Sequence, residues 1–377
     1  MLIHRILYDK VVSKIMPGKA VIVLGPRQCG KSTMLNEIAR QSTFRILKLD
    51  CDDAAIRYRL EIQQLPNLQN LIGNAELVLI DEAQRVKNIG LTLKIIIDQI
   101  KNVRLLVSGS SAFELANYIN EPLTGRKWEY ILLPFSVHEM VAHHGSFQEE
   151  RLLPQRLLYG MYPDVVTNLE NARDVLNQLA NSYLYKDIFS FQDLRKPELL
   201  DKLLKALALQ AGSEVSYNKL AEVIGSDIST VQRYIDLLEK AFIVFRLYAF
   251  SRNLRTELKK TRKVFFYDNG IRNAILGDFR PFELRNDAGS LWENFMVSER
   301  IKRNAFHSFY GSQWFWRTAG QQEIDYLEEY DGQIHAYEFK YGDSKRSSPP
   351  SAFAQAYQVD KMTTVTPKNY QEFLSPS

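Results

Sequence analysis

The sequence predicts an α/β fold whose first part is a parallel sheet, and three observations lead to this prediction. Residues 25–32 read G-P-R-Q-C-G-K-S, a full match to the glycine-rich loop that cradles phosphates. The apolar run before this loop, residues 20–24, predicts a buried strand, and residues 33–41 after it predict a helix. A second apolar run, residues 77–80, ends in an acidic pair. A strand, a glycine loop and a helix in this order are the setting in which such a loop binds phosphate.

The residues of this loop have separate expected tasks. Gly25 and Gly30 let the backbone bend so that several N–H groups point at one phosphate, and the helix start adds its positive dipole end. Lys31 is expected to reach the β- and γ-phosphates, and the Ser32 hydroxyl to bind Mg²⁺. The alternative is a chance glycine turn. The predicted nucleotide-binding residues are Gly25, Pro26, Arg27, Gln28, Cys29, Gly30, Lys31, Ser32 and Thr33.

The acidic pair after the second apolar run predicts the other half of this site. Asp81 is expected to hold Mg²⁺ through water, and Glu82 to polarise the water that attacks the γ-phosphate. A second carboxylate favours ATP hydrolysis over a GTP switch. Taken alone, the pair has an alternative interpretation as the start of a helix, where carboxylates are favoured.

Further strands and helices continue the α/β alternation. Residues 44–49 predict a strand and residues 54–65 helix, and residues 91–100 predict a helix before a strand at 103–107. The next residues, 108–111, read S-G-S-S, and Ser110 is the candidate for hydrogen bonding to the γ-phosphate or the attacking water. A plain loop serine or a helix N-cap is the alternative.

Arg126, just before a predicted strand at residues 128–133, is the candidate arginine finger. A guanidinium held against the γ-phosphate would stabilise the charge that develops there. An exposed loop arginine is an equally good interpretation of the sequence.

Composition limits the class of protein. With 377 residues the chain is expected to form two or three domains, and 45% hydrophobic and 24% charged residues are typical of a globular protein. The sequence has no apolar run long enough for a membrane span, no secretion signal and only two cysteines, which predicts a cytoplasmic protein. A net charge of +4 does not by itself indicate a nucleic-acid partner.

Several motifs together resemble one family. The loop at 25–32, L-I-D-E-A-Q ending at Gln84, S-G-S-S at 108–111, L-T-G-R ending at Arg126 and L-P-F-S ending at Ser136 occur in this order. They resemble the uncharacterised prokaryotic AAA+-type ATPases with a C-terminal domain of unknown function. The resemblance implies a P-loop ATPase core, a winged-helix region and a nuclease-like α/β module. Ser32 stands where the family often has Thr, and either hydroxyl can ligate Mg²⁺.

The chain then divides into four expected parts. They are a P-loop ATPase core at 1–140, a helical linker or lid at 141–200, a winged helix-turn-helix at 201–263 and a PD-(D/E)xK nuclease-like domain at 264–377. No sensor-2 arginine is placed. An arginine finger that acts on a neighbouring copy would require a homo-oligomer.

The middle of the chain supports the winged-helix prediction from its own residues. Residues 216–224 and 225–240 predict two helices with a turn near Gly225, and residues 241–247 predict a wing strand. Thr230, Gln232 and Arg233 are the residues expected to face a major groove. A basic stretch suits phosphate contacts and comprises Arg252, Arg255, Lys259, Lys260, Arg262 and Lys263. The alternatives are a protein-interaction module and a solvated charged hairpin.

The last third of the chain predicts a second metal site. Asp325 lies on one predicted strand and Glu338-x-Lys340 on the next, as in the PD-(D/E)xK nucleases that this segment resembles. Asp325 and Glu338 would share a divalent metal, Lys340 would orient or deprotonate water, and Glu293 on the preceding helix could add a carboxylate. The alternative is a half-buried strand with polar residues on one face.

The sequence therefore predicts an ATPase with ATP and Mg²⁺ as cofactors, whose nucleotide cycle moves C-terminal modules that bind DNA or protein. One alternative is a nucleotide-gated scaffold or sensor that recognises a partner protein. The other is an ATP-regulated, metal-dependent DNA nuclease.

Overall fold

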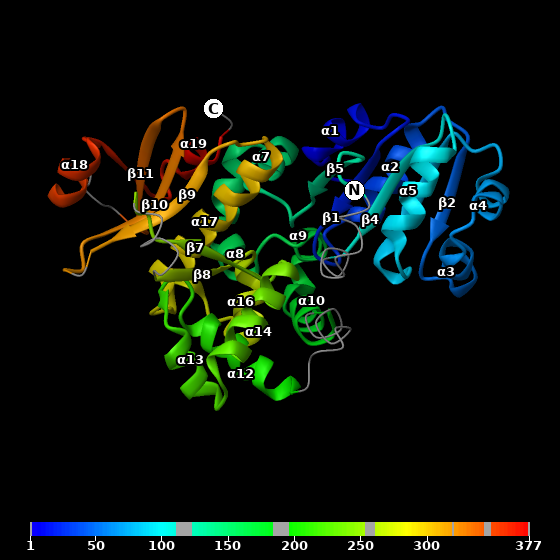
Figure 1. Ribbon diagram of the computed structural model, residues 1–377. Coiled ribbons are helices and arrows are strands. Elements are labelled where there is room, and N and C mark those ends of the chain that lie inside the picture. The colour runs from blue at the N-terminus through cyan, green and yellow to red at the C-terminus, as the bar shows by residue number, and fades with distance from the viewer. Residues whose placement is uncertain are drawn as a thin grey trace. The chain divides into compact units, whose positions relative to one another are not determined.

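The computed structural model describes residues 2–110, 123–183, 196–252, 261–318, 320–342 and 348–375 (Figure 1). Its contacts divide the chain into two compact units. Of the described residues, the first unit holds 2–110 and 123–135 together with 240–242, and the second unit holds the rest. Each unit has its own sheets and core.

The first unit is built on a five-stranded, wholly parallel sheet with the strand order β2-β3-β4-β1-β5 (Figure 1). The strands are β1 (Ala20–Leu24), β2 (Ile46–Asp50), β3 (Leu77–Asp81), β4 (Arg104–Gly109) and β5 (Lys127–Ile131). Every residue of β1 is buried, as a near-continuous apolar run in a parallel sheet requires. The predicted α/β fold with a parallel sheet is confirmed.

Helices connect these strands, and the sequence explains where they begin. They are α1 (Leu7–Ser13), α2 (Lys31–Gln41), α3 (Ala54–Glu61), α4 (Leu65–Ile72) and α5 (Ile89–Gln99), with a short 3₁₀ turn at Ala83–Arg85. The helical segments expected over residues 54–65 are α3, which ends at Glu61, and the first residue of α4, which begins at Leu65. Pro66 lies in the first turn of α4, where its missing N–H and fixed φ suit a helix start and prevent continuation from α3.

The second unit contains two sheets. A three-stranded antiparallel sheet has the order β6-β8-β7, from β6 (Glu214–Val215), β7 (Val244–Tyr248) and β8 (Arg262–Phe266). A four-stranded sheet has the order β12-β11-β10-β9. Its strands are β9 (Ser312–Arg317), β10 (Glu323–Tyr330), β11 (Gln333–Phe339) and β12 (Met362–Val365). The first three of these strands are antiparallel, and β12 returns parallel to β11 after helix α18 (Ser351–Tyr357).

The second unit also contains helices, which are labelled in Figure 1. They are α7 (Val137–His144), α8 (Ser146–Tyr159), α9 (Pro163–Thr167), α10 (Ala172–Gln178), α12 (Pro197–Leu209), α13 (Tyr217–Ile224), α14 (Ile228–Lys240), α16 (Asn269–Leu276), α17 (Ala288–Phe306) and α19 (Tyr370–Leu374), with a π-helical turn at Leu179–Tyr183 and 3₁₀ turns at Leu169–Asn171 and Phe282–Leu284. The pair α13 and α14 occupies the two segments that the sequence predicts as helix-turn-helix. Gly225 ends α13 in the left-handed conformation, and the Asp227 carboxylate accepts the N–H of Thr230 at 2.8 Å.

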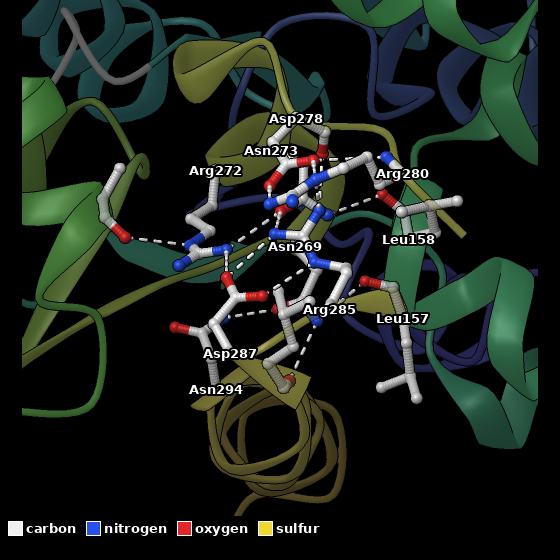
Figure 2. Close-up of polar contacts among 12 residues, drawn as sticks. Leu157, Leu158, Asn269, Arg272, Asn273, Asp278, Arg280, Arg285, Asp287 and Asn294 are labelled. Atoms are coloured by element: carbon white, nitrogen blue, oxygen red, sulfur yellow. Dashed lines mark hydrogen bonds and ion pairs between the residues drawn. The ribbon is translucent and has the colours of Figure 1, made fainter. Parts of the chain in front are cut away.

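A buried polar cluster fastens α16 to its neighbours in this unit. Figure 2 shows Arg272 and Arg285 pointing at the same carboxylate, Asp287, which they contact at 2.5 and 2.8 Å. Asn273 donates its amide N–H to the carbonyl of Leu158 at 2.8 Å, so α16 is tied to α8. Paired, hydrogen-bonded charges of this kind hold elements in one arrangement, because separating them would leave a buried charge without a partner.

A second set of contacts ties β8 to α17. The side-chain amide of Asn294 accepts from the N–H of Phe266 at 2.8 Å and donates to its carbonyl at 3.0 Å. The same amide donates to the side chain of Asn269 at 2.7 Å (Figure 2). The strand that follows the predicted winged helix is therefore bonded directly to the long helix of the C-terminal part.

The predicted boundaries at residues 140, 200 and 263 fall inside α7, α12 and β8. They are therefore not breaks between elements, and the segments on either side of residue 263 share the second unit. The four-part division by task stays a prediction. Within the described ranges, every helix is too short or too polar to cross a membrane.

Candidate functional site

The glycine loop has a backbone that only glycine permits at two positions. Gly25 has a φ of +152°, and a Cβ there would lie 2.0 Å from the carbonyl oxygen of Leu132. Gly30 has a φ of +96° and leads directly into α2. The sequence thus sets the course of the loop between β1 and α2 through the two glycines of the motif.

Lys31 lies inside this loop. Its side chain is buried, and Nζ donates to the carbonyl oxygens of Gly25 at 2.9 Å and Pro26 at 2.8 Å. Ser32 and Thr33 follow in the first turn of α2, which contains no acidic residue. The N–H groups of a first turn lack helical partners and carry a partial positive charge, so this end of α2 suits an anion.

Arg5 supports the loop from the N-terminal segment. Its guanidinium donates to the carbonyl oxygens of Cys29 and Leu133, both at 2.6 Å, and lies 4.8 Å from the ring centroid of Phe135. Sequence reasoning missed this residue, because a single arginine 20 or more positions from the motif has no local pattern.

Asp81 and Glu82 lie where β3 ends, beside the end of β4. The Asp81 carboxylate accepts a short hydrogen bond from the Ser108 hydroxyl and the N–H of Glu82 at 3.1 Å. Glu82 has a φ of 52°, a left-handed conformation that is uncommon for a residue with a side chain. Such strain is found at functional sites, and here it accompanies a carboxylate at the end of the strand.

Gln84 connects Glu82 to the end of β4. Its amide nitrogen donates to the Glu82 carboxylate, and its carbonyl oxygen accepts the N–H of Ser110 at 3.1 Å. The Ser110 hydroxyl is buried and has no hydrogen-bond partner among the described residues. A buried orphan hydroxyl is a position for a ligand atom or water. Ser108 and Gln84 both stood in the quoted motifs, but only the fold reveals that they join the two strand ends.

Arg126 does not lie with these residues. Its carbonyl oxygen accepts the N–H of Ala20, the first residue of β1, whereas the glycine loop follows the last residue of β1. The two ends of this strand are about 13 Å apart, since its five residues span four rises of about 3.3 Å. The Arg126 guanidinium instead pairs with Asp98 at 2.7 Å.

The C-terminal candidates come together only in part. Asp325 on β10 and Glu338 on the neighbouring strand β11 lie where the sequence predicted them, and Asp325 accepts the N–H of Phe339 at 2.8 Å. Glu338 pairs with Lys340 at 2.7 Å. Glu293, from α17, is instead bound to Lys263 at 2.8 Å.

A divalent metal does not fit this arrangement. Within the described ranges, no group of three or more His, Cys, Asp or Glu side chains is placed to hold a metal ion. Burial raises the pKa of Glu293 to about 7; nearby Asp325 and Glu323 also raise it, and Lys263 lowers it. Of the predicted ligands, Glu293 and Glu338 thus have lysine partners within the protein, and Asp325 accepts a backbone N–H.

The predicted DNA-contacting residues are dispersed. Gln232 and Arg233 are exposed on α14, but the Thr230 hydroxyl is bonded to Asp227 at 2.8 Å. Of the basic stretch, Arg255, Lys259 and Lys260 lie outside the described residues. Arg252 and Arg262 lie over the rings of Tyr357 and Tyr217, at 5.5 and 4.3 Å. The expectation that Lys263 contacts phosphate is wrong, because its side chain is only 3% exposed.

Comparison with protein families divides the chain into three matches. Residues 17–141 match the model of a family described as AAA domain. Residues 150–281 and 288–374 match two families described as domains of unknown function, DUF8612 and DUF4143.

The similar curated proteins are themselves uncharacterized. A protein of Mycobacterium tuberculosis is 26% identical over 339 residues, which are 88% of this chain and 71% of that protein. A protein of Haemophilus influenzae is 24% identical, with 68% of this chain and 69% of that protein covered. A protein of Methanocaldococcus jannaschii is 24% identical, with 72% and 66% covered.

Two solved structures show a limited likeness. The RuvB Holliday junction branch migration motor of Thermotoga maritima is 19% identical with a TM-score of 0.35, covering 70% of this chain and 92% of that chain. A structure of two Pif1 helicases on forked double-stranded DNA is 13% identical with a TM-score of 0.25, covering 48% and 52%.

Proposed function

We propose that this chain, which combines an AAA domain with a C-terminal domain of unknown function, binds ATP with Mg²⁺ and hydrolyses the ATP. One observation carries the proposal. The glycine loop follows β1, the acidic pair ends β3, and β4 lies between them in the sheet. Because the strands are parallel, both groups lie at the same sheet edge, which is where ligands bind in such sheets.

In this proposal the nucleotide is held by residues 25–33. Lys31 exchanges its hydrogen bonds to the Gly25 and Pro26 carbonyls for bonds to the β- and γ-phosphates. Ser32 and Asp81 would hold Mg²⁺, and Ser108 would orient the Asp81 carboxylate. When bound with ATP, Mg²⁺ neutralises charge on the β- and γ-phosphates.

Glu82 would position and polarise the attacking water. Its carboxylate is directed by the Gln84 amide, and Gln84 also accepts the N–H of Ser110. The partnerless Ser110 hydroxyl would meet the γ-phosphate or the water. Glu82, Gln84 and Ser110 thus form one connected set that can respond to the γ-phosphate.

Arg126 is proposed to act on the nucleotide of a neighbouring copy and not on its own. Its place at the start of β5, at the sheet edge opposite the glycine loop, supports this choice. Such a role requires a homo-oligomer, and Arg126→Ala should then lower turnover without weakening ATP binding.

The test is steady-state ATP hydrolysis by the full chain with Mg²⁺, with and without duplex and single-stranded DNA. Glu82→Gln should lower kcat by at least about 100-fold while ATP still binds, since a positioned base contributes about 10²–10⁴. Lys31→Ala should weaken ATP binding itself. Unchanged affinity and turnover in Lys31→Ala would refute the proposed site. DNA would be the activator if it stimulates ATP hydrolysis by the wild-type protein and this hydrolysis is lost in Glu82→Gln.

A second candidate function is a nucleotide-gated scaffold that binds a protein segment. A cavity of about 710 Å³ lies beside α13, with both polar and apolar lining. Ile228 at its edge is 47% exposed, and the Asp227 carboxylate at the start of α14 would repel a phosphate backbone. Two results would favour this candidate. One is slow ATP hydrolysis that DNA does not change. The other is a bound protein segment whose binding is lost in Ile228→Asp and kept in the control Gln69→Ala.

A further inference from the structure

Carboxylates from two elements converge on one lysine in the second unit. Lys263, on β8, contacts Glu293 of α17 at 2.8 Å and Glu323 of β10 at 2.5 Å. Asp325, two residues along β10 from Glu323, also raises the pKa of this lysine by its charge. Lys263 Nζ lies 5.4 Å from the ring centroid of Phe315.

The burial of this lysine makes its partners necessary. The Lys263 side chain is 3% exposed, and that of Glu293 is 18% exposed. An ammonium removed from water has a large desolvation cost, which only close carboxylates can offset. The carboxylates also need a cation, because the charges of Asp325 and Glu323 both oppose ionisation of Glu293.

We propose that Lys263 is the resident cation of the carboxylate cluster formed by Glu293, Glu323 and Asp325, in the position where a divalent metal would bind. The cluster is then a metal-free ionic joint, and the C-terminal module does not cleave DNA by metal-dependent hydrolysis. Metal-dependent hydrolysis there would require the ammonium to leave a site in which it has two carboxylate contacts.

The predicted ligands support this inference. A divalent ion needs several oxygen ligands within about 2.0–2.6 Å, and a metal site of the predicted kind would draw Asp325 and Glu338 to one ion. Glu338 is instead bonded to Lys340, and one Asp325 oxygen accepts the backbone N–H of Phe339. Both predicted ligands thus already have a partner within the protein, an ion pair for Glu338 and a hydrogen bond for Asp325.

The same cluster cross-links the two sheets of the second unit. Lys263 comes from the three-stranded sheet and Glu323 from the four-stranded sheet. Arg317 on β9 adds a second bridge, because it lies 3.6 Å from Glu323 and 3.8 Å from Glu214 on β6. Close by, the N–H of Phe250 donates to the carbonyl of Phe315 at 2.7 Å. The lysine therefore closes a joint between β8 and the C-terminal sheet.

The experiment uses the full chain without nucleotide, titrated with Mn²⁺ while free Mn²⁺ is followed by electron paramagnetic resonance. Asp325→Asn should leave the Mn²⁺ binding of the wild-type protein unchanged, because no Mn²⁺ binds at Asp325 in wild type. Lys263→Met should bind one Mn²⁺ through the carboxylates it leaves unpaired, and Lys263→Met with Asp325→Asn should not.

Thermal unfolding gives an independent readout. Lys263→Met should lower the unfolding temperature by about 10 °C, and Mn²⁺ should restore part of that loss. Lys340→Met is the matched control, since Lys340 is 48% exposed, and it should shift the unfolding temperature by no more than about 2 °C.

The proposal would be overturned if wild type binds Mn²⁺ and Asp325→Asn abolishes that binding. It would also be overturned if wild type cleaves DNA with Mn²⁺ and Asp325→Asn does not. An unfolding temperature unchanged by Lys263→Met would refute the joint. If Lys263→Met does not fold, that failure agrees with the joint, and the comparison of wild type with Asp325→Asn still decides whether a metal binds.

Discussion

Single side chains connect the two strand ends at the proposed nucleotide site, and Gln84 is the central one. Lys31, Ser32, Asp81 and Glu82 could be named from the sequence because their spacing reflects a local chemical need. Arg5, Ser108 and Lys263 could not, because each acts through a contact with a residue 24 or more positions away. Lys263 was predicted to contact phosphate with the rest of the basic stretch, but its side chain is buried. The sequence of a basic stretch does not reveal which of its residues is buried.

Gln84→Ala should lower kcat for ATP about tenfold and leave the Michaelis constant for ATP nearly unchanged. The variant removes the amide that directs Glu82 and leaves the N–H of Ser110 without its acceptor, but it touches no residue of the glycine loop. Gln69→Ala, on the exposed side of α4, is the control. A rise in the Michaelis constant with normal kcat would mean that Gln84 supports binding and not the chemical step.

At the scale of elements, the apolar runs of the sequence predicted the strands of the first unit well. The apolar runs of β1 and β3 are unmistakable because both faces of a parallel sheet are covered. The long helix α17 buries charged side chains such as Arg300, whose partner Glu328 lies on β10. Hydrophobic periodicity does not report such pairs.

The attachment of α17 to β10 should depend on pH. Burial alone would raise the pKa of Glu328, but Arg300, at 2.6 Å, with Asn304 and Tyr326 holds it below its ordinary value. A carboxyl with a lowered folded-state pKa stabilises the protein above its unfolded pKa of about 4.3, and this stability is lost as the pH falls through the folded value.

Glu328→Gln should therefore cost about 3–5 kcal/mol at neutral pH and flatten the loss of stability in acid. Urea unfolding of the two proteins between pH 7 and 3, with exposed Glu283→Gln as the control, measures both effects. Parallel pH profiles for wild type and Glu328→Gln would show that Glu328 is not the titrating group.

At the scale of the molecule, the second unit is expected to fold as one body. The fragment 264–377 would begin inside β8 and lose Lys263, which removes the lysine contacts of Glu293 and Glu323. It should lack cooperative urea unfolding, whereas the fragment 136–377 should unfold in a single transition. A sharp transition for 264–377 would contradict this expectation. If the prediction holds, the proposed nucleotide cycle would move the predicted winged helix and the C-terminal domain together.

Both cysteines of the chain are buried in the first unit, one of them inside the glycine loop. The Cys29 thiol donates to the carbonyl of Leu132 at 3.0 Å, and burial, with nearby carboxylates, raises the pKa of Cys51 to about 12. Oxidants and alkylating agents attack the exposed thiolate, and neither residue offers one while the sheet is folded. Oxidative stress in a cell would therefore leave the glycine loop chemically intact.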